Sequence, residues 1–181
     1  MERQDKGMPF LLKYENVAWY EDGTVRILDR RVFPHERRFV TCKDYHEVIK
    51  AIQDMVTQSA GPFTAVGMGM ALAAYQCKDE AEDKRVAFLK KAADELGHAR
   101  PTTANRYSAI THRALDKQLK ALQAGDSAIE AAFNDTIDSL NRRYATEQKI
   151  GDNFVSLLSN NSSFLTHCYA ETVIGCIIRA A

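Results

Sequence analysis

Hydrophobic residues recur with two different periods along this chain, and the first is the period of β-strands. Short apolar runs at residues 17–20 and 24–28 flank Glu21-Asp22-Gly23. An Asp-Gly pair between two such runs is a typical hairpin turn. A third run, residues 38–42, predicts another short strand. The N-terminal part of the chain is therefore expected to form a small antiparallel sheet.

Helical spacing begins directly after this sheet. Asp44, followed three residues later by Glu47, predicts a helix N-terminus with a capping box. The polar segment 58–62, which contains Gly61 and Pro62, is expected to end this first helix. Its buried face would carry one apolar stripe, formed by Val48, Ile52, Met55 and Val56.

The most apolar segment, residues 63–75, is expected to be the central buried helix. Within it, Gly67 and Gly69 would let neighbouring backbones approach closely. The pattern predicts further helices over 86–96, from residue 102 or 103 to about 124, and from 129 to 144. The apolar spacing of the last helix continues after Gly151 at Phe154, Leu157 and Leu158.

Residues 161–181 differ in character from the helices before them. Residues 164–166 (Phe-Leu-Thr) predict a short buried strand, and a turn then leads into an apolar helix over 173–181. Strand, tight turn and helix form the first βα unit of a Rossmann-like sheet, whose other units the chain lacks. The expected fold class is mostly α with a small N-terminal antiparallel sheet (α+β). The expected divisions are a flexible N-terminus (1–12), a sheet and helical-bundle domain (13–160) and the start of a truncated Rossmann-like domain (161–181).

Composition narrows the class of protein. The chain has 181 residues, with 24 Lys+Arg and 24 Asp+Glu, so its formal net charge is zero. This balance argues against a broad nucleic-acid surface. The four cysteines form no CxxC pair or zinc-type cluster, and no segment resembles a signal peptide or a membrane span. We therefore expect a cytoplasmic protein with reduced thiols and with no metal, cofactor, nucleic-acid or membrane partner.

Cys168 is the first candidate for chemistry. It lies where the predicted strand ends and the predicted C-terminal helix begins, and a helix N-terminus favours the thiolate. His167 and Glu171 flank it and could tune the thiol or carry protons. The alternative is a buried, inert cysteine, because free cysteines are among the most buried residues.

Two further segments could hold an anion. Arg100 precedes Pro101 and a predicted helix start, which is a plausible oxyanion or phosphate site. Gln58, Ser59 and Ala60 form a polar loop of small residues before the buried helix, and such loops can hold phosphate through backbone N–H groups. The alternatives are a solvated surface arginine and an ordinary turn between helices.

Several stretches, taken in order, resemble one superfamily. They include Leu28-Asp29-Arg30, Pro34-His35-Glu36, the stretch Arg100-Pro101-Thr102-Thr103 and the stretch Leu165-Thr166-His167-Cys168. The chain is similar over nearly its whole length, from about Lys13, to methylthioribose-1-phosphate isomerase. The same superfamily holds ribose-1,5-bisphosphate isomerase, 5-deoxyribose-1-phosphate isomerase and the regulatory subunits of eukaryotic initiation factor 2B.

The resemblance implies an aldose–ketose isomerase that acts on a pentose-1-phosphate, such as 5-methylthioribose-1-phosphate in methionine salvage. It implies that Cys168 is the catalytic cysteine and that Arg100 holds the phosphate end of the substrate. It places Gln58, Ser59 and Ala60 in the phosphate loop. The family's catalytic aspartate lies in a dimerising C-terminal domain, past residue 181. We therefore expect the 181-residue chain alone to be inactive, and either a homo-oligomer or a missing C-terminal half to be involved.

The chain departs from the family at two of these positions. The enzymes usually carry Arg-Gly-Ala in the phosphate loop, where this chain has Gln58-Ser59-Ala60. Asn and then a small-residue pair with Gly usually follow the cysteine, where this chain has Tyr169-Ala170-Glu171. These changes indicate a divergent branch. They leave open a noncatalytic regulatory protein resembling the initiation factor 2B subunits, an isomerase for another sugar phosphate of the superfamily, or an orphan fragment without activity.

Overall fold

The computed structural model describes residues 2–159, 161–167 and 169–180. The predicted N-terminal sheet is present as three antiparallel strands in the order β1 (Ala18–Glu21), β2 (Thr24–Leu28) and β3 (Phe39–Cys42). Asp22 and Gly23 both have positive φ angles, 46° and 75°, as a two-residue type I′ hairpin requires. The hairpin pairs Glu21 with Thr24 and so fixes the register of β1 and β2.

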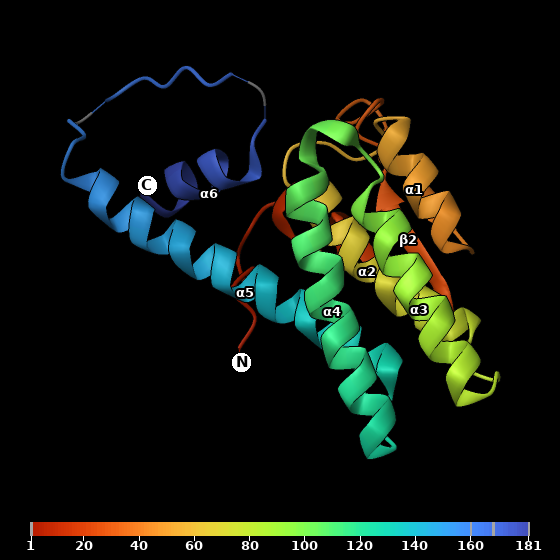
Figure 1. Cartoon of the computed structure of the whole chain (residues 1–181). Helices are drawn as coiled ribbons and strands as arrows, with labels where there is room; N and C mark the ends of the chain where they lie inside the picture. The colour runs from red at the N-terminus through yellow and green to blue at the C-terminus, as the bar shows by residue number, and fades with distance from the viewer. Residues whose placement is uncertain (1, 160, 168, 181) are drawn as a thin grey trace.

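Helices make up most of the remaining fold, as the sequence predicted (Figure 1). Asp44 caps the first of them, because its side chain accepts a hydrogen bond of 2.7 Å from the His46 N–H. Glu47 accepts from the Lys43 N–H, one residue before the capping-box position. The helices are α1 (Tyr45–Gln53), α2 (Gly61–Gln76), α3 (Glu82–Gly97), α4 (Ala104–Ala124), α5 (Ala128–Val155) and α6 (Glu171–Ala180), with short 3₁₀ turns at Phe10–Leu12, Tyr14–Asn16 and Pro101–Thr103.

Helix α2 lies at the centre of the fold and contacts α1, α3, α4, α5 and the sheet (Figure 1). Nearly all its residues are buried, in agreement with the predicted central helix. Gly67 is a point of close approach, because a Cβ atom there would collide with the Thr136 side chain of α5. A Cβ atom at Gly69 would lie 3.0 Å from Leu96 Cδ2 of α3. Both glycines therefore allow close packing of helices, as predicted.

Two predicted helix faces end earlier than their apolar spacing indicated. Helix α1 ends at Gln53, and Met55 follows it with a φ angle of 60° and a side chain that is 46% exposed. Val56 is buried, but in the loop after the helix. Helix α5 passes through Gly151 and ends at Val155, so Leu157 lies outside it and is 80% exposed. Apolar spacing continued past both ends because it does not report where backbone hydrogen bonding stops.

The predicted buried strand at residues 164–166 is wrong in this structure. These residues are irregular and exposed, and no strand in the described part of the chain lies beside them to supply ladder hydrogen bonds. The apolar helix that follows is present as α6, which begins at Glu171 and packs along α5 (Figure 1). A Rossmann-like domain beginning at residue 161 stays a prediction.

The N-terminal residues have contacts of their own. Leu11 and Leu12 are buried, and Asp5 accepts a hydrogen bond of 3.0 Å from the Tyr14 N–H. Arg3 forms an ion pair with Asp5, and the Leu12 carbonyl accepts from the Tyr144 hydroxyl of α5. These contacts place residues 3–14 against α5. No helix in the described part of the chain is long and apolar enough to span a bilayer.

Candidate functional site

The predicted phosphate loop lies against the start of α6. Glu171 is buried, and its Oε2 accepts a hydrogen bond of 3.3 Å from the Ala60 N–H, at the N-terminus of α2. The Ser59 hydroxyl lies 3.4 Å from the Tyr169 carbonyl oxygen, and Ser59 has a φ angle of 55°. The α2 N-terminus has no side-chain cap of its own. Glu171 therefore places a negative charge where a helix dipole and free N–H groups favour one.

Arg30 completes this arrangement, although sequence reasoning did not select it as a site residue. Its Nη1 lies 3.0 Å from Glu171 Oε1, and its Nη2 donates to the Tyr169 carbonyl at 3.3 Å. The Arg30 and Glu171 side chains are only 9% and 2% exposed, so this ion pair is largely desolvated. Its backbone N–H donates to the Val56 carbonyl, which brings the end of β2 beside the loop. The only sequence signal was the position of Arg30 in the family-like stretch Leu28-Asp29-Arg30.

A cleft of about 430 Å³ opens beside the ion pair. Such a volume lies within the usual range for small-molecule sites. Arg30, Gln58 and Tyr169 supply its polar groups. The rest of its wall is apolar and comes from the N-terminal segment and the loop after β2, at Pro9, Phe10, Leu11, Phe33 and Pro34. Three segments far apart in the sequence therefore meet at one cleft.

Arg100 has local partners for its guanidinium. Its Nε and Nη2 atoms donate to the Ile52 carbonyl at 3.0 and 2.6 Å, and Nη2 also contacts the Met55 sulfur. Arg100 therefore satisfies a carbonyl in the last turn of α1, where cations are favoured. The Met55 carbonyl accepts from the Gln58 side chain, so Arg100 and the predicted phosphate loop share a neighbour. The predicted role of Arg100 in holding phosphate stays a prediction.

Cys168 lies outside the described residues, and its predicted role stays a prediction. The other three cysteines are free and buried. Burial raises the pKa of the Cys42 thiol to about 12 and also raises the pKa values of Cys77 and Cys176. None of these three thiols is suited to act as a thiolate near neutral pH.

The two residues that flank Cys168 are placed differently. His167 is exposed, whereas Glu171 is held by Arg30 and by the Ala60 N–H. A carboxylate held in this way can carry a proton only after its ion pair opens. Their proposed tuning or proton roles stay predictions.

Residues 58–181 match the Initiation factor 2 subunit family. The match covers more than half of the chain and includes both the loop at residues 58–60 and helix α6. The chain therefore belongs to this family.

Relatives with catalytic names match over most of this chain. It is 32% identical to the methylthioribose-1-phosphate isomerase of Syntrophotalea carbinolica over 173 residues, which cover 90% of this chain and 49% of that protein. It is 30% identical to the Natranaerobius thermophilus protein of the same name over 152 residues, which cover 82% of this chain and 44% of that protein. The chain thus spans about half the length of these relatives.

Solved structures share the fold. The delta subunit of translation initiation factor eIF-2B from A. fulgidus superposes with a TM-score of 0.68 at 24% identity, over 91% of this chain and 50% of that chain. The 5-methylthioribose 1-phosphate isomerase from Pyrococcus horikoshii superposes with a TM-score of 0.67 at 23% identity, over 91% of this chain and 48% of that chain. An isomerase and an initiation factor subunit therefore share this architecture.

Proposed function

We propose that this chain is the N-terminal portion of an aldose–ketose isomerase that acts on a pentose-1-phosphate such as 5-methylthioribose-1-phosphate. The observation that carries the proposal is the cleft at which Arg30, Gln58 and Tyr169 meet, in a chain whose relatives are named as isomerases of this sugar phosphate. A 5-deoxyribose-1-phosphate or ribose-1,5-bisphosphate substrate would use the same chemistry.

The chemistry demands an acid and a base in a dry pocket. A phosphate on the anomeric oxygen prevents ring opening by loss of the anomeric proton, so the ring oxygen must be protonated. Hydrogen must then move from C2 to C1. We assign Cys168 to one face of this reaction. The opposing carboxylate would come from a C-terminal half like that of the relatives, and Arg100 with residues 58–60 would hold the phosphate.

Ketose formation from 5-methylthioribose-1-phosphate tests this proposal. The assay uses the 181-residue chain alone and the same chain joined to the second half of the S. carbinolica relative. We expect no turnover by the chain alone, turnover by the joined protein, and a loss of about 10²–10⁴ in rate with Cys168→Ser. A joined protein that is folded and inactive, or activity that survives Cys168→Ser, would contradict the assignment.

Alkylation tests the cysteine separately from turnover. Iodoacetamide near pH 7.5, followed by peptide mass mapping, should label Cys168 first, because burial raises the pKa of the other three thiols. Cys168→Ser should remove the fast phase of labelling. Faster labelling of Cys42 or Cys77 would leave the role of Cys168 resting on family resemblance alone.

The second candidate is a noncatalytic regulatory protein resembling the initiation factor 2B subunits. One observation favours it: the Glu171 carboxylate already takes the Ala60 N–H and the Arg30 guanidinium, which are groups that a phosphate could use. Glu171→Gly distinguishes the two candidates. If a phosphate group must enter here, this variant should bind the sugar phosphate more tightly than the parent chain.

A further inference from the structure

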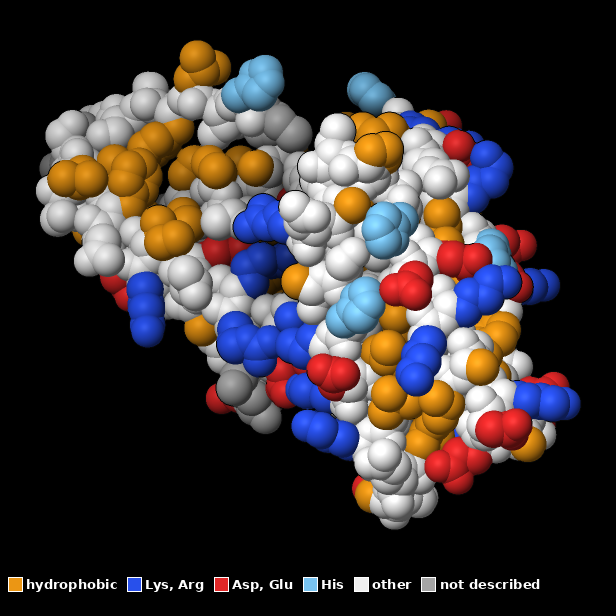
Figure 2. Space-filling model, viewed as in Figure 1, with side chains coloured by type: hydrophobic (Ala, Val, Ile, Leu, Met, Phe, Trp, Pro, Cys, Tyr) orange, Lys and Arg blue, Asp and Glu red, His pale blue; other side chains and the backbone are white. Residues whose placement is uncertain are grey.

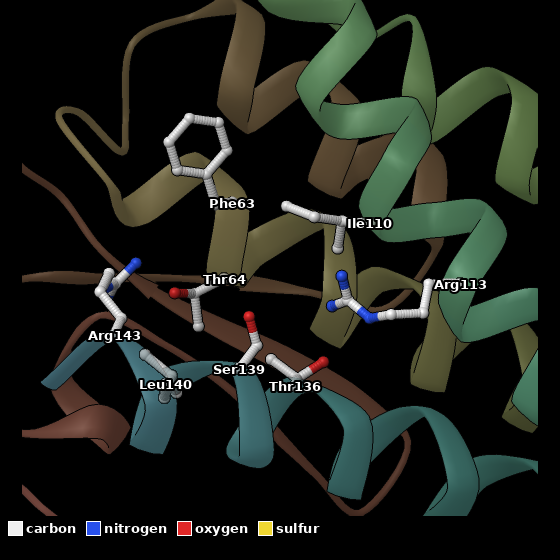
Figure 3. A pocket seen from close by; sticks show the side chains of 8 residues that line it. All are labelled: Phe63, Thr64, Ile110, Arg113, Thr136, Ser139, Leu140 and Arg143. Atoms are coloured by element: carbon white, nitrogen blue, oxygen red, sulfur yellow. The ribbon is translucent and has the colours of Figure 1, made fainter. Parts of the chain in front are cut away.

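A second polar cavity lies between α2, α4 and α5, and none of its lining residues belongs to the site described above. Figure 3 shows Thr64 from α2, Arg113 from α4, and Ser139 and Arg143 from α5 around it. Phe63 and Ile110 form an apolar wall. The cavity encloses about 20 Å³, which is space for about one water-sized atom. The Arg113 side chain is 39% exposed, so the cavity is close to solvent.

Buried donors without acceptors gather around this cavity. Arg143 has two such atoms, Nε and Nη2, and the Thr64 hydroxyl is a third buried group without a hydrogen-bond partner. Thr64 itself is only 2% exposed. Arg113 Nη2 has an ion-pair contact of 3.0 Å with Asp135 but no hydrogen bond. Unsatisfied buried donors are costly, and several around one cavity call for a shared acceptor.

The local charge favours an anion over a water molecule as that acceptor. No carboxylate lines the cavity among the described residues. Asp135 is the one printed acidic partner of both Arg113 and Lys117, which leaves one positive charge in excess in that trio. Glu147 lies one turn along α5 from Arg143 and couples to it electrostatically, but no hydrogen bond joins the two side chains. Figure 2 shows Lys and Arg side chains gathered across the middle of this face.

We propose that this cavity binds a tetrahedral oxyanion, namely the phosphate group of a phosphate monoester. One phosphate oxygen would enter the cavity and accept from Arg143 and Thr64, while Arg113 would face the others. Arginine suits this role, because its planar fork of donors matches phosphate oxygens. Phe63 and Ile110 would contact the carbon-bearing part of the ligand. The proposal does not depend on the isomerase assignment, because it uses neither Arg100 nor the loop at residues 58–60.

Inorganic phosphate is the probe. Its affinity for the 181-residue chain is measured by isothermal titration calorimetry, at an ionic strength matched with potassium chloride. Arg143→Met should weaken phosphate binding about tenfold or more, as expected for losing charge-assisted hydrogen bonds. Thr64→Val, a change of similar shape, should weaken it about threefold. Arg142→Met is the matched control: its neighbouring side chain is exposed, and its loss should change affinity less than twofold.

Three outcomes would overturn the proposal. The parent chain shows no phosphate binding, so that water satisfies the donors; Arg142→Met weakens binding as much as Arg143→Met, so that the attraction is diffuse; or Arg100→Met alone abolishes binding, so that phosphate sits at the site of the proposed function. Circular dichroism melting in potassium chloride checks that each variant is folded. Thr64→Val keeps the test decisive if Arg143→Met does not fold.

Discussion

The α2 core and the α5–α6 region bury opposite kinds of groups. The α2 core, meaning buried α2 residues and the side chains packed on them, is apolar throughout, with Met68, Met70 and Leu72 fully buried. The α5–α6 region, meaning residues 144–155 of α5 together with α6, buries the carboxyl groups of Glu147 and Glu171. Its apolar side chains are exposed instead, at Ile150, Val155, Val173 and Ile178.

This difference indicates two sources of stability. Apolar burial stabilises the α2 core without any partner. The α5–α6 region depends on an ion pair and on close backbone contact, since Gly151 and Gly175 lie where a Cβ atom would meet the other helix. A contiguous apolar exterior also points to an interface. Four sets of variants and one solution measurement test the contrast, in decreasing order of expected effect.

Leu72→Ala should cost about 2–5 kcal/mol of unfolding free energy, because it leaves a cavity in the fully buried α2 core. Leu157→Ala is the matched control beyond the α5 helix, where the side chain is 80% exposed, and should change stability by less than about 0.5 kcal/mol. Urea unfolding measures both. Equal effects of the two substitutions would remove the contrast between the regions.

Gly67→Ala should cost about 1–3 kcal/mol, because the new methyl group meets the Thr136 side chain on α5. Thr136→Ala should make room for it, so the double variant should be more stable than the sum of the single changes predicts. A double-variant cycle in urea gives the coupling energy. Strict additivity would show that α2 and α5 do not pack at this point as closely as described.

Asp29 should make stability fall in acid. Hydrogen bonds from Arg31 lower the pKa of its buried carboxyl to about 2, and the backbone N–H of Arg31 and the side chain of Arg38 add to this. Because the folded state favours the charged form, the contribution is complete above about pH 4 and is lost as pH falls towards about 2. We expect about 1–2 kcal/mol, reduced by the exposure of both arginines. Asp29→Asn should flatten the measured pH profile; an unchanged profile would contradict this.

Glu147 should act with the opposite sign. Burial raises the pKa of its carboxyl, so the folded state favours the neutral form and stability is lost as pH rises through the folded pKa. Glu147→Gln should therefore give a small gain in stability at neutral pH and little change in acid. Thermal unfolding at two pH values tests it, and a loss at neutral pH would mean that the charge has a favourable partner.

The exposed apolar side chains should promote weak self-association. Leu165 is fully exposed and Val173 is 44% exposed, on residues that line one apolar groove between α5 and α6. Leu165→Ser together with Val173→Ser should lower the association constant measured by sedimentation equilibrium, with no more than a small change in unfolding free energy. Serine at exposed Met55, outside this region, is the control. A monomer at all concentrations would contradict the expectation.

Much of the fold could be predicted from the sequence because its determinants are local. Asp22-Gly23 adopts the backbone angles that its hairpin requires, and Asp44 caps α1 through its own neighbour His46. Gly125 ends α4 with a φ angle of 76°, which glycine tolerates at no steric cost. The apolar run at residues 63–75 identified α2 as the central helix. Each of these features depends on residues a few positions apart.

The candidate site could be predicted only in part. Sequence alone selected Gln58, Ser59, Ala60 and Glu171, and the structure brings that loop together with Glu171. It did not indicate that Arg30 would pair with Glu171 across 141 residues, or that Arg100 would bond to a carbonyl of α1. Side-chain partners so far apart leave no trace in local spacing.

Local chemistry by itself determined the turns, the caps and the central helix of this protein, because short-range sterics and hydrogen bonds decide them. Tertiary structure alone decided which charges meet, at Arg30 and Glu171 and around Arg143. It also decided that residues 164–166 form no strand, because a strand needs a neighbouring strand for its backbone hydrogen bonds and the described part of the chain places none there.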